Sequence, residues 1–229
     1  MACWADGMTL GKTFRYQGEK RLDFILSLAG KESPEVAVIS SVTEVSSYER
    51  EKLEETYGRV VVLDPAAHGA LSEYGVPDTL PYDRAASFLA CRYLFKGKSC
   101  TVFDFGTTFT IDMISEDGSY LGGAVSLGLR TRFKSLNRYS RTLPLVNIPS
   151  GEVSPGTDIR TSIEAGVISG IMFEIKGWME INKDALAVFT GGDAIYFAKR
   201  MKNSIFVVCN LVLIGLATIA GDYVKKNTR

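Results

Sequence analysis

The chain has 229 residues, of which 46% are hydrophobic, enough to bury the core of one large domain or two small ones. Lysine plus arginine equals aspartate plus glutamate, at 26 each, so no excess of positive charge points to a nucleic acid or an anionic membrane as partner. One histidine and four scattered cysteines leave little material for a metal cluster, a catalytic triad or a disulfide framework. The composition favours a protein that binds small ligands or other proteins.

Neither end of the chain carries the pattern of a targeting or membrane-spanning segment. The first residues, MACWADGMTLGK, lack the apolar run of a secretory signal. The apolar run at 205–220 contains Asn210 and falls short of the roughly 18 apolar residues that a spanning helix needs. We therefore expect a buried strand followed by a packed helix there, and a cytoplasmic location for the chain.

Strands and helices alternate in the first hundred residues. Buried strands are expected at 34–40 (PEVAVIS) and 59–64 (RVVVLD), with a charged helix at 45–57 between them. The segment 74–81 contains two prolines and is expected to form a loop, which leads into an amphipathic helix at 83–95. This alternation predicts a layered α/β fold.

The second half opens on the segment 101–123, TVFDFGTTFTIDMISEDGSYLGG, which predicts an antiparallel meander of three strands. Helices are expected at 125–136 and at 158–179, the second with apolar residues at roughly helical spacing. The sequence LAVFTGGDA at 186–194 then predicts a strand that ends in a Gly-Gly turn before a further helix.

The turn after the first strand of the meander carries residues suited to phosphate binding. Asp104 closes the strand, and Gly106, Thr107 and Thr108 follow it. Glycine lets the backbone approach a phosphate, successive amides can point at its oxygens, and the hydroxyls add donors. A carboxylate beside them can hold a cation or its water shell. An ordinary hairpin with threonine at its turn is the alternative.

Two further glycine-rich places lie downstream. In Thr190–Asp193 (TGGD), a nucleotide base or ribose can lie against the bare backbone of Gly191 and Gly192, although Gly-Gly also forms plain turns. Gly122 and Gly123, followed by Gly128 at an expected helix start, form the other such place.

Several motifs, in a fixed order, resemble those of the type III pantothenate kinases. DFGTTFTID at 104–112 resembles the second phosphate motif of that family, DxGTAxT, and YGVPDTLPYDR at 74–84 resembles its YxNPxxLGxDR segment. LGGAVSLGL at 121–129 is similar to GGxIxPG, and FTGGD at 189–193 resembles the turn on the adenosine side. The similarity covers most of the chain from about Tyr74 onward.

The resemblance implies an α/β fold of the actin-like superfamily, with duplicated ribonuclease H-like domains at 1–97 and 98–229, each a mixed sheet flanked by helices. It implies transfer of the ATP γ-phosphate to pantothenate in the first step of coenzyme A biosynthesis, with magnesium and a monovalent cation, potassium or ammonium. The expected partners are pantothenate, ATP and a second copy of the chain in a homodimer, with no nucleic acid and no membrane.

By the same resemblance, Asp83 is the general base that takes the proton of the pantothenate hydroxyl, and Asp104 is the ligand of the monovalent cation. The positions implied on the substrate side are Tyr74, Pro81, Tyr82, Arg84 and Ile159. The positions implied on the ATP side are Asp6, Gly7, Thr9, Lys12, Gly106, Thr107, Gly191 and Gly192. A carboxylate at a helix start with a surface ion pair is the alternative explanation of Asp83 and Arg84.

The first phosphate motif of the family, DxGNTxxK, is altered in this chain. Residues 5–12, ADGMTLGK, give the best register, with Ala5 at the leading acid and Met8 at the asparagine. A gap of one residue would make Asp6 the acid instead, and both registers stay open.

Three other positions also depart from the family pattern. Pro81 replaces a glycine, Leu127 replaces a proline, and Ile159 replaces a threonine that contacts pantothenate across the dimer. These departures leave three hypotheses: an active pantothenate kinase, a diverged member that binds ATP or a pantothenate-like ligand weakly and acts as a regulatory protein, and a kinase of another small alcohol.

Overall fold

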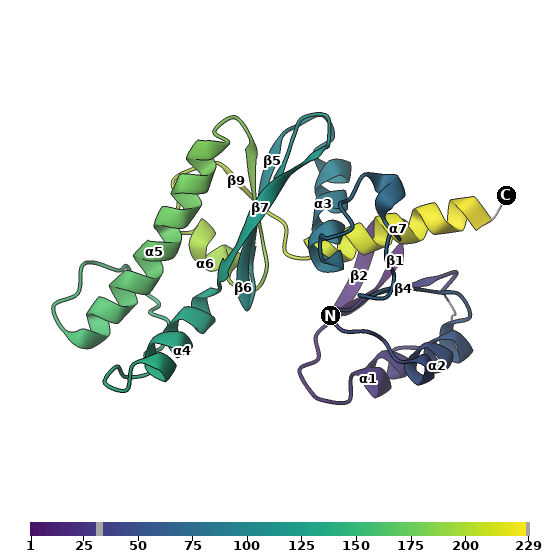
Figure 1. The fold of residues 1–229 in the computed structure, drawn as a ribbon, viewed down its shortest axis with the longest axis horizontal. Helices are drawn as coiled ribbons and strands as arrows, with labels where there is room; N and C mark the ends of the chain where they lie inside the picture. The colour runs from purple at the N-terminus through teal and green to yellow at the C-terminus, as the bar shows by residue number, and fades with distance from the viewer. Residues whose placement is uncertain (31–33, 228–229) are drawn as a thin grey trace. The chain divides into compact units, whose positions relative to one another are not determined.

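The computed structural model describes residues 1–30 and 34–227, and the chain forms two compact units (Figure 1). The first unit is Met1–Leu94 together with Leu211–Arg229, and the second is Phe95–Asn210. Within the described ranges, no helix is long and apolar enough to cross a membrane. The division into ribonuclease H-like domains at 1–97 and 98–229 stays a prediction.

Among its described residues, the first unit contains two pairs of strands and four α-helices. β1 (Ala2–Asp6) and β2 (Thr9–Phe14) form an antiparallel hairpin, and β3 (Ala37–Ser40) pairs with β4 (Val60–Leu63) in parallel. The helical segments are α1 (Arg21–Ser27), α2 (Ser47–Tyr57), the short 3₁₀ helix η1 (Ser72–Tyr74), α3 (Tyr82–Leu94) and α7 (Leu211–Asn227). The strands and helices predicted between residues 34 and 95 are confirmed, with boundaries shifted by a few residues.

The start of α2 is set by local sequence. The Ser46 hydroxyl accepts a hydrogen bond from the Glu49 amide at 3.3 Å, and the Glu49 carboxylate accepts one from the Ser46 amide at 2.9 Å. This reciprocal pair satisfies two amides that a helix start otherwise leaves without partners.

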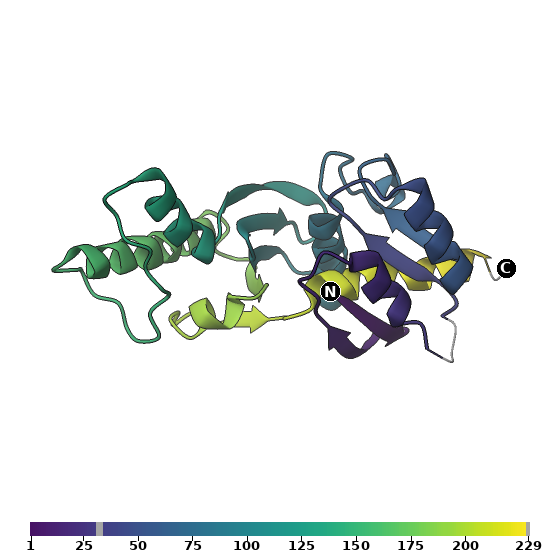
Figure 2. The ribbon, with the colours of Figure 1, turned by 90° about the horizontal axis from the view of Figure 1, so that it is seen from below.

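The C-terminal helix α7 packs against α3 within the first unit, and Figures 1 and 2 show α7, in yellow, running through that unit. Their contact requires small residues: a Cβ atom at Gly215 would lie 1.9 Å from the carbonyl oxygen of Ala86. Ala85, Ala86 and Ala90 are fully buried on the facing helix. The predicted strand and packed helix at 205–220 are confirmed as β9 (Ile205–Val207) and α7, but the expectation of a buried strand is wrong, because β9 is the edge strand of its sheet and Phe206 and Val207 are exposed.

A buried carboxylate closes β4. The Asp64 side chain is fully buried, and its Oδ2 atom accepts hydrogen bonds from the Val45 amide at 2.8 Å and the Arg50 guanidinium at 2.5 Å. Its Oδ1 atom accepts one from the Ala66 amide at 3.1 Å. Burial pushes the pKa of Asp64 up, but these hydrogen bonds and the charge of Arg50 outweigh burial and hold the pKa below its ordinary value.

We expect Asp64→Asn to lower the stability of the protein by about 3 kcal/mol or more, because it leaves Arg50 without its buried partner. Since the pKa of Asp64 is lower in the folded than in the unfolded protein, its contribution is complete above about pH 4 and is lost as the pH falls through the folded pKa. Urea denaturation at neutral and acid pH measures both effects. The difference between parent and variant should shrink at acid pH. The control, Glu55→Gln, breaks an exposed ion pair with Lys52 and should leave the unfolding midpoint nearly unchanged.

The second unit is built on a five-stranded mixed sheet in the order β7-β6-β5-β8-β9. β5 (Cys100–Phe105), β6 (Thr108–Ile114) and β7 (Tyr120–Leu127) form the predicted antiparallel meander, while β8 (Leu186–Thr190) runs parallel to both β5 and β9. Its helices are α4 (Leu129–Tyr139), α5 (Ile159–Ile181) and α6 (Ala194–Ala198). The mixed sheet with flanking helices confirms the α/β prediction.

An aromatic cluster fills the core of the second unit. The Phe105 ring lies 4.8 Å from Phe109, 4.9 Å from Phe189 and 5.0 Å from Phe197, measured between ring centroids. Because successive side chains of a strand point to opposite faces, the burial of Phe105 directs the neighbouring Asp104 to the other face of the sheet.

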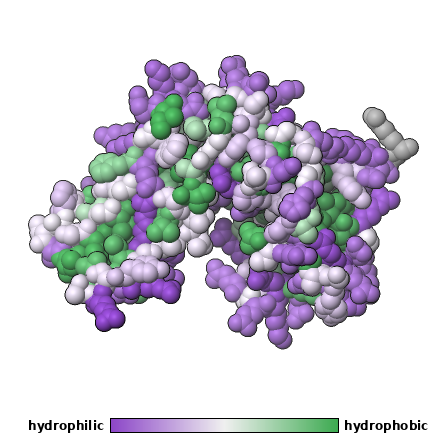
Figure 3. Space-filling model, in the orientation of Figure 1, coloured by the Kyte–Doolittle hydropathy of each residue, from purple (hydrophilic) through white to green (hydrophobic). Residues whose placement is uncertain are grey.

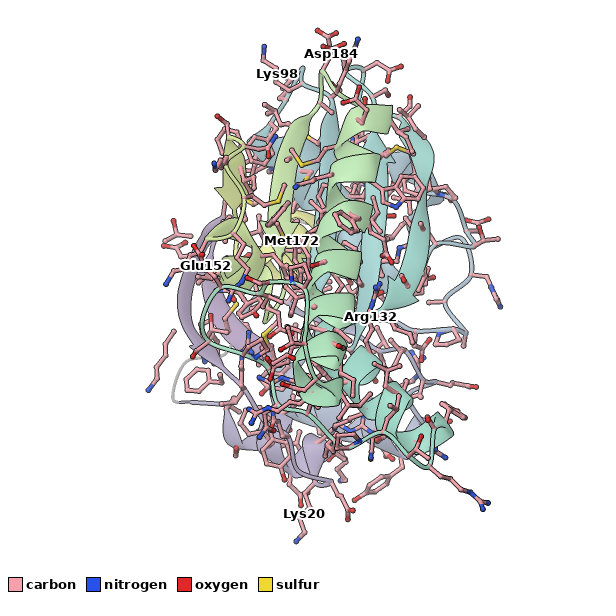
Figure 4. The ribbon with its side chains drawn as sticks, turned by 90° about the vertical axis from the view of Figure 1, so that its left-hand side faces the viewer. Lys20, Lys98, Arg132, Glu152, Met172 and Asp184 are labelled. Carbon is pink, nitrogen blue, oxygen red and sulfur yellow. The ribbon has the colours of Figure 1, made fainter. Side chains whose placement is uncertain are left out.

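The long helix α5 lies across the sheet, with Arg132 of α4 beside it (Figure 4). The Arg132 guanidinium donates to both carboxylate oxygens of Glu174, at 2.7 and 2.8 Å. It also donates to the carbonyl oxygen of Leu127 at 2.8 Å, so one side chain joins the end of β7, α4 and α5.

The expectation of a helix from residue 125 is wrong at its start. β7 continues to Leu127, which pairs with Thr108, and α4 begins only at Leu129. The reason is tertiary: pairing with β6 satisfies the backbone of residues 125–127 as a strand, with Val125 and Leu127 exposed and Ala124 and Ser126 half-buried.

Candidate functional site

The turn between β5 and β6 presents Asp104, Gly106 and Thr107. Asp104 is half-buried and lies in register with Thr110 on β6 and Thr190 on β8. Gly106 and Thr107 are exposed, and the Gly106 amide donates to the Thr108 carbonyl oxygen at 3.0 Å. The structure thus places a carboxylate beside an exposed turn of glycine and hydroxyl residues.

The N-terminus of α4 holds this turn from one side. The carbonyl oxygen of Thr107 accepts hydrogen bonds from the Gly128 amide at 3.0 Å and the Thr131 hydroxyl at 2.7 Å. A Cβ atom at Gly128 would lie 2.1 Å from the carbonyl oxygen of Gly106, so only glycine fits. The sequence showed Gly128 as a glycine at a helix start, but nothing local indicated that it packs against residues 106 and 107.

The turn between β8 and α6 closes the other side. Gly191 has a φ of +89°, and a Cβ atom there would lie 2.4 Å from Asp104 Oδ1 and 2.7 Å from the Phe105 backbone. The Asp193 amide donates to the Phe105 carbonyl oxygen at 3.2 Å. The structure therefore brings together Asp104, Gly106, Thr107 and Gly191, which the sequence predicted as site residues from two separate segments.

Asp193 is a residue that the sequence analysis did not assign. It follows Gly192 directly and its side chain is half-buried. Burial raises the pKa of the Asp193 carboxyl, and the positive charge of Arg130 on α4 acts in the opposite direction. A carboxylate and a guanidinium thus flank the junction formed by the two turns and the start of α4, which we call the glycine junction (residues 104–107, 128–131 and 190–193).

We expect Gly191→Ala to weaken ATP binding at least about tenfold, because the left-handed backbone costs roughly 1–2 kcal/mol and the new methyl group meets Asp104. Titration calorimetry measures the affinity and thermal unfolding measures the stability. Gly151→Ala is the matched control, since it lies outside the glycine junction, a Cβ atom there meets nothing within 4 Å and φ is not positive. Equal loss of stability in both variants would contradict the steric explanation.

In the first unit, Asp83 lies in the first turn of α3. The carbonyl oxygen of Pro81 accepts the Ala85 amide at 2.8 Å, so the helix begins directly after the proline. Asp83 is exposed, and its Oδ1 atom accepts the Arg84 amide at 2.9 Å. The start of α3 thus presents the Asp83 carboxyl group at the surface of the first unit.

Tyr82 is held by the loop that follows β4. Its hydroxyl group donates to the carbonyl oxygen of Ala67. Burial raises the pKa of Tyr82, and the charges of Asp64 and Asp78 act in the same direction, so the hydroxyl keeps its proton. Tyr82 and Asp83 are therefore together at the start of α3, as the sequence predicted.

Tyr74 is the last residue of η1 and lies outside α3. Its carbonyl oxygen accepts a hydrogen bond from Arg92, and the Lys226 ammonium of α7 lies 5.6 Å from its ring centroid. Arg92 follows Asp83 by nine residues, about 13 Å along a helix. The printed contacts of Tyr74 thus belong to the far end of α3, and its assignment to the substrate stays a prediction.

The β1–β2 hairpin carries the altered first motif. Gly7 forms the turn with a φ of +56°, Asp6 pairs with Thr9, and Ala5 pairs with Leu10. Met8 is half-buried, and its sulfur accepts a hydrogen bond from the Thr218 hydroxyl of α7 at 3.7 Å.

The side chains of Asp6, Thr9 and Lys12 are exposed. Counting back from the turn glycine in each unit, Ala5 corresponds to Asp104 and Asp6 to Phe105. Because neighbouring side chains of a strand point to opposite faces, Ala5 and Asp6 cannot serve the same function without a local rearrangement.

Ile159 is the first residue of α5 and its side chain is 55% exposed. The helix start itself is capped by Asp158, which accepts the Thr161 amide at 2.9 Å. Among the described residues, no group of three or more histidine, cysteine or acidic side chains is arranged to hold a metal ion.

The five-stranded mixed sheet with its flanking helices confirms the predicted α/β class, and the glycine junction lies at one end of that sheet. A family model described as type III pantothenate kinase matches residues 4–180. The chain belongs to the type III pantothenate kinase family. The match ends before Gly191 and Gly192, whose assignment therefore depends on geometry.

Two relatives carry the name type III pantothenate kinase. The protein from Christiangramia forsetii is 38% identical over 184 residues, covering 79% of this chain and 76% of its own. The protein from Azobacteroides pseudotrichonymphae is 32% identical over 225 residues, covering 96% of this chain and 91% of its own.

A crystal structure from Campylobacter jejuni, described as a Baf family transcriptional activator, is similar with a TM-score of 0.56. The two chains are 22% identical, and the similarity covers 90% of this chain and 88% of the other. At this identity the likeness shows the fold alone.

Proposed function

We propose that this chain transfers the γ-phosphate of ATP to the hydroxyl group of pantothenate, the first step of coenzyme A biosynthesis. Membership of the family supports an ATP-dependent kinase that works with a divalent metal. The observation that carries the proposal is the glycine junction, in which backbone hydrogen bonds join the end of β5 to the Gly-Gly turn and the exposed turn to the start of α4, beside Asp104. Relatives named as kinases over most of their length favour turnover over the alternative of a regulatory binding protein.

On the ATP side, we assign phosphate binding to the backbone of Gly106 and Thr107 and the adenosine side to Gly191 and Gly192. Phosphoryl transfer depends mainly on positioning and charge neutralisation, so an exposed turn of glycine and hydroxyl residues beside a carboxylate suits this chemistry. Asp104 would hold the monovalent cation, potassium or ammonium, and magnesium would enter with the phosphates of ATP. The β1–β2 turn would add Asp6, Gly7, Thr9 and Lys12.

On the pantothenate side, Asp83 would act as the general base. Its carboxylate accepts the proton of the hydroxyl group while that oxygen bonds to the γ-phosphorus, and the bond to the ADP oxygen breaks. Arg84 would bind pantothenate beside it. Tyr74, Pro81, Tyr82 and Ile159 complete the substrate side by the family pattern.

A cytoplasmic homodimer is part of the proposal. Hydrophobic residues reach the surface of the second unit (Figure 3), among them Val125 of β7, at 60% exposure, and Phe173 of α5, at 68%. Exposed apolar side chains of this size are suited to a protein interface. Ile159, in place of a threonine, would then lie near the partner subunit.

We expect Asp83→Asn to reduce kcat by at least about a hundredfold and to leave the affinity for ATP nearly unchanged, because a base acts on proton transfer and contributes little to ground-state binding. A coupled assay for ADP with pantothenate gives kcat, and calorimetry gives ATP affinity. Asp78→Asn, an exposed carboxylate in the preceding loop, is the matched control. Unchanged turnover in the Asp83 variant would remove Asp83 from the mechanism.

We expect Asp104→Ala to abolish the response of activity and of ATP affinity to potassium, because it removes the carboxylate beside the phosphate turn. The assay is run over a series of potassium concentrations at constant ionic strength. A full potassium response in the variant would place the cation elsewhere.

We expect the triple variant Ala5→Asp, Met8→Asn, Ile159→Thr to phosphorylate pantothenate faster than the parent. The substitutions restore polar side chains that would contact ATP and pantothenate, and each restored hydrogen bond contributes roughly 1–3 kcal/mol. Steady-state kinetics with each single variant shows which position contributes. If the parent already turns over rapidly and the triple variant is no faster, Asp6 is favoured as the leading acid of the first phosphate motif. If parent and variant are both inactive although ATP binds, the regulatory hypothesis replaces the kinase.

A further inference from the structure

We propose that Asp64 is a positioning residue for the pantothenate side of the site, acting through Ala67 and Tyr82 on the first turn of α3. This inference rests on the proposed function, because it concerns the helix turn that carries Asp83 and Arg84. All the groups involved belong to the first unit.

The Asp64 carboxylate has a fixed orientation because both of its oxygens are engaged. Oδ2 accepts from the Val45 amide and from Arg50, and Oδ1 accepts from the Ala66 amide. Arg50 is itself held by a second hydrogen bond, from its Nε atom to the Val45 carbonyl oxygen at 3.0 Å. A fully buried charge with several directed donors has little freedom to move.

The backbone turns around this carboxylate at the start of the loop that joins β4 to α3. The Ala67 amide donates to the Asp64 carbonyl oxygen at 2.9 Å, one residue after the amide that binds the side chain. The carbonyl group of Ala67 is thereby directed, and it accepts the hydroxyl group of Tyr82.

The hydrogen bond from Tyr82 to Ala67 fixes the first turn of α3, which carries Asp83. Tyr82 is the first residue of α3 and is bonded directly to Asp83. Because its hydroxyl group donates to the Ala67 carbonyl oxygen, Tyr82 orients the helix start in addition to its assignment to the substrate side. The intervening segment, 65–81, contains no helix longer than the three residues of η1, so it needs an anchor of this kind to present a defined geometry.

The test leaves Asp64 in place, and Tyr82→Phe also leaves the buried ion pair intact. Because Arg50→Gln leaves the buried carboxylate without its cation, thermal unfolding is measured first to establish that this variant is folded. Arg50→Gln removes the charge that holds Asp64, Arg50→Lys restores it, and Tyr82→Phe removes the hydrogen bond to Ala67. Lys52→Gln, which removes a cation from the same helix at an exposed ion pair, is the matched control.

We expect kcat/KM for pantothenate to fall about tenfold in Arg50→Gln and in Tyr82→Phe, with KM for ATP unchanged within about twofold. The double variant should lose little more than either single variant, because both act on one chain of contacts. Arg50→Lys should recover most of the loss, and Lys52→Gln should match the parent. Additive losses of about a hundredfold in the double variant, or an equal rise in KM for ATP, would overturn the inference.

Hydrogen exchange separates this inference from the proposed function. In Arg50→Gln, the amides of Ala67 and Ala85 should exchange faster, while those of α7 keep the parent rate. A parent without pantothenate kinase activity would refute the proposed function, and local loosening confined to 65–85 would still support Asp64 as the anchor of the α3 start. Uniform loosening of the whole unit would refute the positioning role.

Discussion

The close approach of three backbone segments at the glycine junction is the constraint on which the second unit's site depends. Gly128 and Gly191 each stand where a Cβ atom would lie less than 2.5 Å from another residue. Phe105 supplies the reason for the approach, because its ring is buried among Phe109, Phe189 and Phe197 and fixes the end of β5 in the core. Packing on one face of the strand thereby sets the position of Asp104 on the other face.

The first unit positions its functional residues by a different physical means. The buried carboxylate of Asp64 accepts hydrogen bonds from two backbone amides and one guanidinium, and these bonds fix the start of the long loop before α3. A buried charge is costly unless every oxygen is satisfied, and here the surrounding donors offset that cost. The helix that carries Asp83 is also held along its length by α7, whose Gly215 allows the two backbones to touch. The unit thus joins the N-terminal and C-terminal parts of the chain.

The two hairpins show how one motif can diverge in its environment. In β5–β6 the residue two before the turn glycine is Asp104, which faces Thr110 and Thr190. In β1–β2 the same place is Ala5, and Met8 of the turn contacts Thr218 on α7 instead of presenting an amide side chain. An apolar, flexible side chain suits this half-buried place, so the change at Met8 has a structural explanation within the unit. For Ala5 the structure offers no comparable contact.

The sequence alone indicated the strands from residue 34 onward, most helices and the membership of the kinase family, because these depend on local periodicity, on capping residues and on short motifs whose spacing survives divergence. It did not indicate the β1–β2 hairpin. It indicated Asp83, Asp104, Gly106, Thr107 and the Gly-Gly turn by the same motifs. Only the tertiary structure showed that α7 packs with the first unit and that β7 continues to Leu127. It also showed that Gly128 and Gly191 pack closely against residues 104–107, and that Asp64 binds the backbone that leads to α3. Each of these depends on contacts between residues far apart in the chain, and no local pattern records which distant backbone will meet a glycine or a buried carboxylate.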